Sequence, residues 1–206
     1  MHKHLLDLCD ADNAILLVID PQGKIFRMAY NTEQLSVLIS KIMRVAALYK
    51  IPVVLTEQYP KGLGETAPEL REVFDALETE KHHFVKDFFG CCGEPGFNEL
   101  IARLATEIKK KRIGDAERPV DIVVVGIETQ VCVQQTVLEL LKQGYRVVVL
   151  QDCTGSRVKE YHKIAIKRFH RAGAVISNFE SVAFEWTRTK NNACFKQMSA
   201  IVREGI

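Results

Sequence analysis

The sequence has no long hydrophobic run and almost no net charge. No apolar stretch approaches the roughly 20 residues of a membrane helix, and the acidic N-terminal segment lacks the pattern of a secretory signal. Lys and Arg number 28 against 26 Asp and Glu, so charge gives no general reason to bind nucleic acid or membranes. We expect a cytoplasmic protein, with a mitochondrial location left open, and reduced thiols that include the adjacent Cys91 and Cys92.

Motifs typical of nucleotide-binding and hydrolytic α/β proteins are also missing. Neither G-x-G-x-x-G nor a Walker lysine loop follows the first apolar run, and G-x-S-x-G does not occur. His82 and His83 are adjacent, and His162 and His170 are eight residues apart, so no pair has the spacing of a metal chelate. We therefore expect neither a cofactor nor a bound metal.

What is present is a repeated alternation of short Val- and Ile-rich runs with longer segments of helical spacing. At 206 residues, 47% apolar and 26% charged, the chain suits a single globular domain spanning 1–206. The runs predict strands at 15–19, 53–56, 82–85, 120–125, 147–150 and 174–177. The spacing predicts helices at 32–49, 66–77, 97–111, 130–143, 159–172 and 192–203.

This alternation predicts an α/β fold, a three-layer αβα sandwich around a sheet of about six mostly parallel strands. Ligands of such sheets bind at the C-terminal ends of the strands. Asp20 follows the first strand, the segment 81–86 contributes lysines from the third, and Cys132 lies in the first turn of the helix after the fourth. A helix N-terminus lowers the pKa of a thiol, and a thiolate is a nucleophile that a carboxylate and an ammonium can assist.

Each of these residues alone also fits an ordinary structural role. An Asp before Pro21 suits a turn, a lysine can be solvated, and an intracellular Cys is often a small core residue. Their joint placement at one edge of the sheet favours a cysteine hydrolase over an α/β binding module.

Several segments, in the right order, resemble the isochorismatase-like cysteine hydrolases, and most closely the isochorismatase-domain-containing proteins. The similarity covers about residues 13–200, and the segments that carry it are 15–22, 55–64 with 66–70, 126–136 and 144–153. The resemblance implies the fold predicted above and an Asp, Lys, Cys triad.

In this chain the implied triad is Asp20, a lysine of the third strand and Cys132. Lys81, three residues before Phe84, is favoured by a K-x-x-F pattern, and Lys86 is the alternative. The resemblance also implies a cis peptide bond between Ile127 and Glu128, with backbone N–H groups of Glu128 and Cys132 forming an oxyanion hole. We expect the substrate pocket to include four residues near these motifs: Gln22, Phe26, Gln58 and Phe84.

The implied reaction is hydrolysis of a small amide or carbamoyl substrate through a thioester on the cysteine. A metal-dependent nicotinamidase is disfavoured, because residues 56–60 contain no histidine. Two alternatives stay open: a catalytically weak binding or assembly protein and, less favoured, a nucleic-acid-processing protein with basic segments at 109–112 and 163–171. We expect a small-molecule substrate, no membrane partner and a homo-oligomer.

Overall fold

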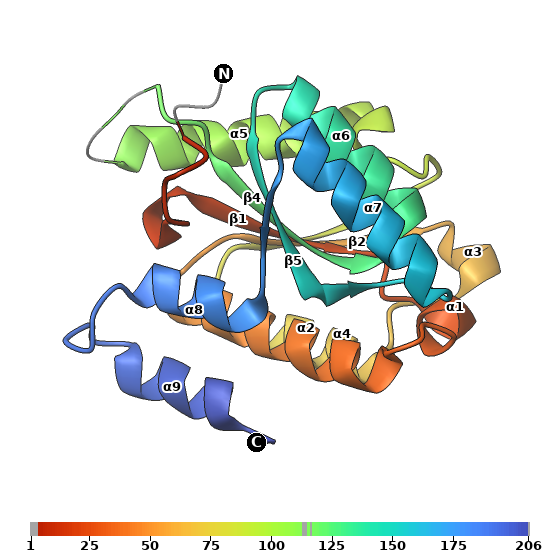
Figure 1. Ribbon diagram of the computed structural model, residues 1–206, viewed down its shortest axis with the longest axis horizontal. Helices are drawn as coiled ribbons and strands as arrows, with labels where there is room; N and C mark the ends of the chain where they lie inside the picture. The colour runs from red at the N-terminus through yellow and green to blue at the C-terminus, as the bar shows by residue number, and fades with distance from the viewer. Residues whose placement is uncertain (1–3, 113–114, 116, 206) are drawn as a thin grey trace.

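The computed structural model describes residues 4–112, 115 and 117–205, which form a parallel sheet between two layers of helices (Figure 1). The six strands run in the order β3-β2-β1-β4-β5-β6, and every neighbouring pair is parallel. The strands are β1 (Ala14–Ile19), β2 (Val53–Gln58), β3 (Lys81–Lys86), β4 (Asp121–Ile127), β5 (Arg146–Gly155) and β6 (Val175–Ser177). The predicted fold class is confirmed.

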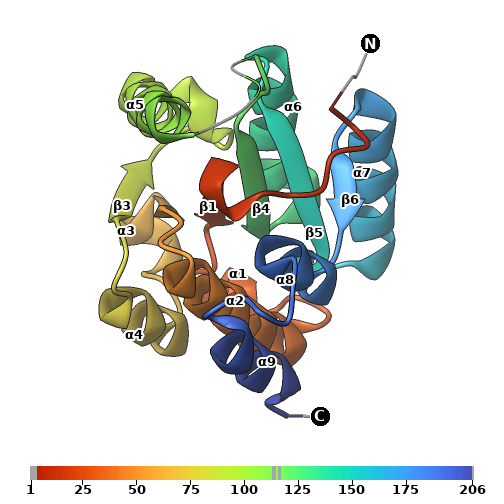
Figure 2. The ribbon, with the colours of Figure 1, turned by 90° about the vertical axis from the view of Figure 1, so that its left-hand side faces the viewer.

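Helices cover both faces of the sheet. On one side lie α5 (Pro95–Lys111), α6 (Gln134–Lys142) and α7 (Lys159–Ala172). On the other lie α2 (Thr32–Leu48), α4 (Pro68–Ala76), α8 (Phe179–Thr187) and α9 (Phe195–Arg203) (Figure 2). Because helices shield both faces, every residue of β1, β2 and β4 is buried, which is why β1, the first half of β2 and most of β4 are apolar.

Three helices were not expected from the sequence. Two are single turns, α1 (Gly23–Arg27) and α3 (Pro60–Leu63), which follow β1 and β2. The third is α8, which starts where the Asn178 side chain accepts a hydrogen bond from the backbone N–H of Ser181 at 2.8 Å. Its buried face includes Phe179, Val182 and Trp186, so tertiary packing stabilises a helix that the sequence pattern did not reveal.

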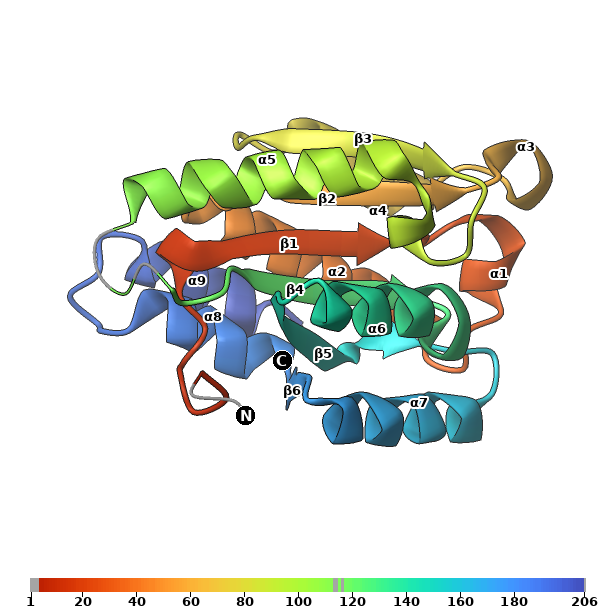
Figure 3. The same ribbon diagram turned by 90° about the horizontal axis from the view of Figure 1, so that it is seen from above.

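The C-terminal ends of the strands form one edge of the molecule, where α1 and α3 lie (Figure 3). From β1 the chain crosses to β2 and β3 on one side, and β4 returns to the other side of β1. The edge between β1 and β4 is therefore the topological switch point, the usual ligand position of such sheets. Within the described ranges, no helix combines the length and hydropathy needed to cross a bilayer.

Candidate active site

Asp20 is held at the end of β1 by its backbone and by one side-chain bond. Its φ of 47° lies in the left-handed region, which Asp tolerates better than most residues. Its backbone N–H donates to the Thr56 carbonyl at 3.2 Å, and Thr56 Oγ1 donates to Asp20 Oδ1 at 2.6 Å. The strand thus fixes a carboxylate that is only 4% exposed.

Lys86, the last residue of β3, reaches across β2 to this carboxylate. Its Nζ lies 2.7 Å from Asp20 Oδ2 and also donates to Gln58 Oε1 at 2.8 Å and to two backbone carbonyls in the loop after β3. Burial lowers the pKa of Lys86, but the charge of Asp20, its hydrogen bond and the neighbouring thiols together outweigh burial, and the net pKa is raised. The side chain is therefore a buried ammonium.

Lys81, the favoured triad lysine, lies at the wrong end of β3. Its Nζ donates to the backbone carbonyls of Asp75 and Leu77. Five residues of strand separate it from Lys86, which is roughly 16 Å at 3.3 Å per residue. The K-x-x-F pattern was misleading because the site forms where the strand ends, so the expectation for Lys81 is wrong and Lys86 occupies that place.

Cys132 lies in a π-helical segment, Thr129–Val133, that leads into α6. Its thiol interacts with the Asp20 carboxylate, and the residue is 8% exposed. Burial, and then the negative charge of Asp20, raise the pKa of the thiol well above its usual range, and the Lys86 charge only partly opposes them. The shift is thus opposite to the lowering expected from the helix N-terminus, and burial beside the Asp20 carboxylate favours the neutral thiol of Cys132.

The loop between β4 and Cys132 has the backbone that the resemblance implied. The peptide bond between Ile127 and Glu128 is cis. The Glu128 carbonyl accepts the Val131 N–H at 2.9 Å, while its carboxylate pairs with Arg157, Nε to Oε1 at 2.9 Å. Burial would raise the pKa of Glu128, but its bonds with Arg157 lower it overall, so this side chain is an ionised anchor for the loop.

The two glutamines expected in the substrate pocket hold the scaffold instead. Gln22 has no exposed surface; its Oε1 accepts the Gln58 N–H at 2.6 Å, and its Nε2 donates to the Gly64 carbonyl at 2.6 Å. Gln58 accepts from Lys86 and donates to the Asp87 carbonyl at 2.7 Å. Both amides are thus committed to protein partners, and Gln22 is not a pocket residue.

The two phenylalanines expected in the pocket lie on opposite faces of the sheet. Phe26 has no exposed surface and belongs to the core cluster on the α2 face, so its assignment to the pocket is wrong. Phe84 packs edge-on against Phe97 of α5, with ring centroids 5.8 Å apart, beside the cluster that contains Cys132. For Phe84, contact with substrate stays a prediction.

Sequence reasoning missed three residues that surround the cluster of Asp20, Lys86 and Cys132. Thr56 binds Asp20, and Thr136 Oγ1 donates to the Cys132 carbonyl at 2.8 Å while accepting the Cys91 N–H at 3.0 Å. Cys91 has no exposed surface, and burial raises its pKa to about 12. The one available signal was the polar end of an otherwise apolar run at Thr56, since the others depend on packing.

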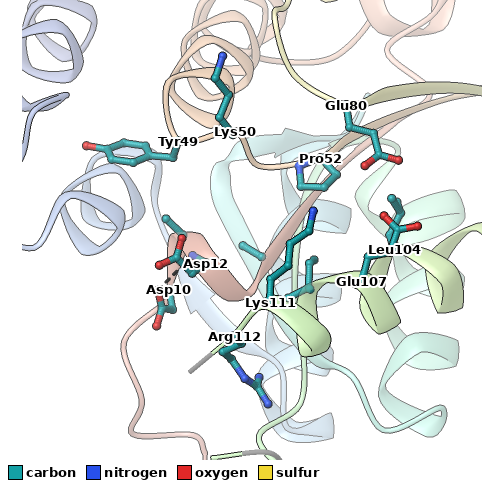
Figure 4. A pocket seen from close by; sticks show the side chains of 13 residues that line it. Asp10, Asp12, Tyr49, Lys50, Pro52, Glu80, Leu104, Glu107, Lys111 and Arg112 are labelled. Carbon is teal, nitrogen blue, oxygen red and sulfur yellow. Dashed lines mark hydrogen bonds between the residues drawn. The ribbon is translucent and has the colours of Figure 1, made fainter. Parts of the chain in front are cut away.

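A cavity lies at the opposite, N-terminal end of the strands (Figure 4). It measures about 440 Å³ and is lined by residues of mixed charge, including Asp10, Lys50, Glu80 and Glu107. Asp20, Lys86 and Cys132 are not part of its wall, and no thiol lines it. Over the described part of the chain, no three His, Cys, Asp or Glu side chains come together as metal ligands would.

The fold and the site define a doubly wound α/β protein with an Asp, Lys and Cys cluster at its switch point. The model of the isochorismatase domain matches residues 14–181, and the chain belongs to the isochorismatase family, whose members are generally hydrolytic. Isochorismatase family protein 1B of Dictyostelium discoideum is 31% identical, with 94% of this chain and 87% of the relative covered. Isochorismatase domain-containing protein 2A of Mus musculus is 30% identical, with 95% and 85% covered.

Solved structures show the same fold. The MAR1 ribonuclease from Caenorhabditis elegans is 28% identical with a TM-score of 0.81, covering 95% of this chain and 92% of that one. YcaC from Escherichia coli, described as an octameric hydrolase of unknown specificity, is 19% identical with a TM-score of 0.80, covering 95% and 89%. At that lower identity the likeness concerns the fold alone.

Proposed function

We propose that the protein is a cysteine hydrolase of a small amide or carbamoyl compound, with Cys132 as nucleophile, Asp20 as proton carrier and Lys86 as the buried cation. The observation that carries the proposal is the 2.7 Å ion pair between Lys86 and Asp20, with the Cys132 thiol against the same carboxylate. Burying two charges costs desolvation energy that their attraction often does not recover, so a gain in stability alone explains this ion pair poorly. Nucleophile, base and orienting group within reach of one another are the usual signature of nucleophilic catalysis.

In the first half of the reaction, the thiol proton moves to Asp20 as sulfur attacks the carbonyl carbon. Each carboxylate oxygen keeps a lone pair for this proton, because Oδ1 accepts from Thr56 and Oδ2 has the Lys86 ion pair. Backbone N–H groups of Glu128 and Cys132 would hold the oxyanion. The C–N bond then breaks, the amine leaves with the proton from Asp20, and an acyl group remains on sulfur.

In the second half, Asp20 takes a proton from water, and the hydroxide attacks the thioester. The C–S bond breaks, the acid leaves and the proton returns to sulfur. Lys86 keeps the carboxylate ionised between these steps and prevents it from turning away, since the ammonium is itself fixed by Gln58 and two carbonyls.

The test is mass spectrometry of the intact protein, quenched after mixing with a panel of small primary amides, ureas and carbamates. We expect an acyl adduct on Cys132 with at least one compound, and no adduct and no released amine with Cys132→Ala. Cys91→Ala serves as the matched control, because it removes the neighbouring buried thiol and leaves the triad. Turnover that survives Cys132→Ala would remove the nucleophile from the proposal.

Hydrolysis of RNA is the second candidate, because a similar structure at 28% identity is described as a ribonuclease. The balanced charge of the chain and the burial of Asp20 and Lys86 favour a small substrate over a polymer. Incubating a fluorescently labelled RNA with wild-type protein and with Cys132→Ala distinguishes RNA hydrolysis from hydrolysis of a small amide. Cleavage that depends on Cys132 would favour the ribonuclease.

A further inference from the structure

The outward side of α7 carries a concentration of positive charge. Against a single acidic residue, Glu160, the helix has five basic ones: Lys159, Lys163, Lys167, Arg168 and Arg171. The helix is therefore strongly positive, whereas the whole chain has a net charge of only +2 and the remainder of the chain is net negative. The charge balance of the whole chain conceals this local surplus.

The packing of α7 turns these basic side chains outward. The buried side of the helix faces the sheet and α6, and it consists of His162, Ala165, Ile166 and Phe169. All five basic residues are exposed, and α7 forms an outer edge of the molecule (Figures 2 and 3). Ile164, Lys167 and Arg171 recur at intervals of three and four residues, so they share the side of the helix that faces away from the core.

Most of these cations have no anionic partner in the protein. Lys163 lies 3.2 Å from the Glu160 carboxylate, and both side chains are more than half exposed. Lys167, Arg168 and Arg171 form no ion pair or side-chain hydrogen bond with any residue that the structure describes. Their charge is therefore free to meet an anionic partner.

Two large apolar side chains lie among the cations. Tyr161 and Ile164, three residues apart, are 53% and 58% exposed. A partner that offers only phosphates would leave Ile164 in water, and stacking on bases needs aromatic rings, whereas Tyr161 is the only Phe, Tyr or Trp exposed on α7. The headgroup region of a bilayer offers anions and apolar depth together, so it accepts both kinds of side chain.

We propose that α7 binds the surface of a membrane that contains anionic lipid. Clusters of about four to eight Lys and Arg on a helix are attracted to such surfaces. The helix lies on the surface and does not cross it, because its buried side is committed to the core. This partner differs from the expectation of no membrane partner, which rested on the charge of the whole chain and on the lack of a long apolar run. The surface does not depend on the proposed hydrolase activity.

Cosedimentation of the full chain with lipid vesicles tests the proposal. The probes are vesicles of phosphatidylcholine alone and vesicles in which about a third of the lipid is phosphatidylserine. We expect binding to the anionic vesicles in about 0.05 M salt and release in about 0.5 M salt, because salt screens exposed charges, and no binding to phosphatidylcholine alone. No sedimentation with anionic vesicles in low salt, or equal sedimentation with both kinds of vesicle, overturns the proposal.

Two double variants locate the binding. Lys167→Glu with Arg171→Glu reverses two charges on the outward side of α7 and should weaken binding to anionic vesicles about tenfold or more. Lys190→Glu with Lys196→Glu reverses two exposed charges beside and within α9, in the opposite helix layer, and should leave binding within about twofold of wild type. Equal losses in the two variants would show a response to net charge alone and overturn the proposal.

A labelled single-stranded RNA is the competing probe. Ile164→Ser removes an apolar side chain and no charge, so we expect it to weaken vesicle binding about threefold or more. Tighter binding of the wild type to the RNA than to anionic vesicles, in the same salt, overturns the proposal in favour of a nucleic acid. Wild-type vesicle binding in Ile164→Ser would also contradict it.

Discussion

At the scale of residues, the position of a side chain along its strand decides whether it reaches the candidate site. Lys81 and Lys86 are the first and last residues of the same strand, yet only Lys86 meets Asp20. The desolvated surroundings that pair these charges also keep Cys132 protonated. Position along the strand therefore determines which lysine reaches Asp20, and burial raises the pKa of the thiol beside it.

The first prediction separates the two lysines. Lys86→Met removes the partner of a buried carboxylate, and we expect turnover to fall on the order of a hundredfold or more, because both the orientation and the charge of Asp20 depend on the ammonium. Lys81→Met should leave turnover unchanged, since Lys81 contacts the Asp75 and Leu77 carbonyls and the Phe74 ring, at the far end of β3 from Asp20. Steady-state kinetics of both variants, on a substrate found in the amide panel, measures the two effects. A larger loss of turnover in Lys81→Met than in Lys86→Met would contradict the assignment of Lys86.

The second prediction concerns pH and the buried His162. Its folded pKa of about 4 lies below the ordinary 6.5, so the unfolded chain takes up a proton as pH falls from 6.5 and the folded chain does not until about pH 4. The free energy of unfolding should therefore decrease between pH 6.5 and 4. Urea titrations of wild type and His162→Gln measure this slope, which should be shallower in the variant.

The control for this pH effect is His170→Gln, because His170 is an exposed residue of the same helix. Its slope should match that of wild type. Identical slopes for wild type and His162→Gln would contradict a buried neutral imidazole.

At the scale of elements, the site depends on how closely β1 and β4 approach. Ile19 and Gly126 are register partners, and a Cβ built on Gly126 would lie 2.0 Å from the Ile19 carbonyl oxygen. Gly126 also has a φ of +116°, which L side chains rarely adopt. Glycine at this position lets the strand that ends at Asp20 lie against the strand that leads to Cys132.

The third prediction follows from this contact. Gly126→Ala should destabilise the fold by about 3 kcal/mol or more, because the added methyl group meets backbone that cannot move without shifting β1. Gly144→Ala is the control: its φ is also positive, but nothing lies within 4 Å of the added carbon, so we expect about 1 kcal/mol. Thermal and urea unfolding compare the two, and an equal loss would show that φ alone matters.

At the scale of the whole molecule, exposed apolar residues gather near the candidate site. Tyr59, Val85, Phe88 and Phe89 are each more than half exposed, and they lie on or directly after the edge strand β3 and its neighbour β2. Contiguous apolar surface beside an unpaired strand edge favours association between chains.

The fourth prediction is that the protein self-associates. Light scattering should give a mass of at least twice the 23.3 kDa of one chain. Replacing Phe88 and Phe89 together by Ser should shift the population toward smaller species, whereas replacing the exposed Phe184 of α8 should not. A monomer at tens of micromolar wild-type protein would refute the prediction.

The sequence by itself determined the sheet. Buried parallel strands need apolar side chains on both faces, so β1, β2, β4 and the first half of β5 are readable as Val- and Ile-rich runs, and with them the edge where Asp20 and Cys132 end up. The amphipathic helices α2, α5 and α7 can also be predicted from the sequence, because each packs only one face against the core and its apolar residues recur with the helical period.

Only the tertiary structure decided which lysine pairs with Asp20, that Gln22 and Gln58 serve as scaffold, and that His162 is buried. These outcomes depend on distances between strands and on the loss of water around each group. The spacing of residues along the sequence reports neither the distances between strands nor the loss of water. The role of a buried charge or amide depends on the partners that surround it once the chain has folded.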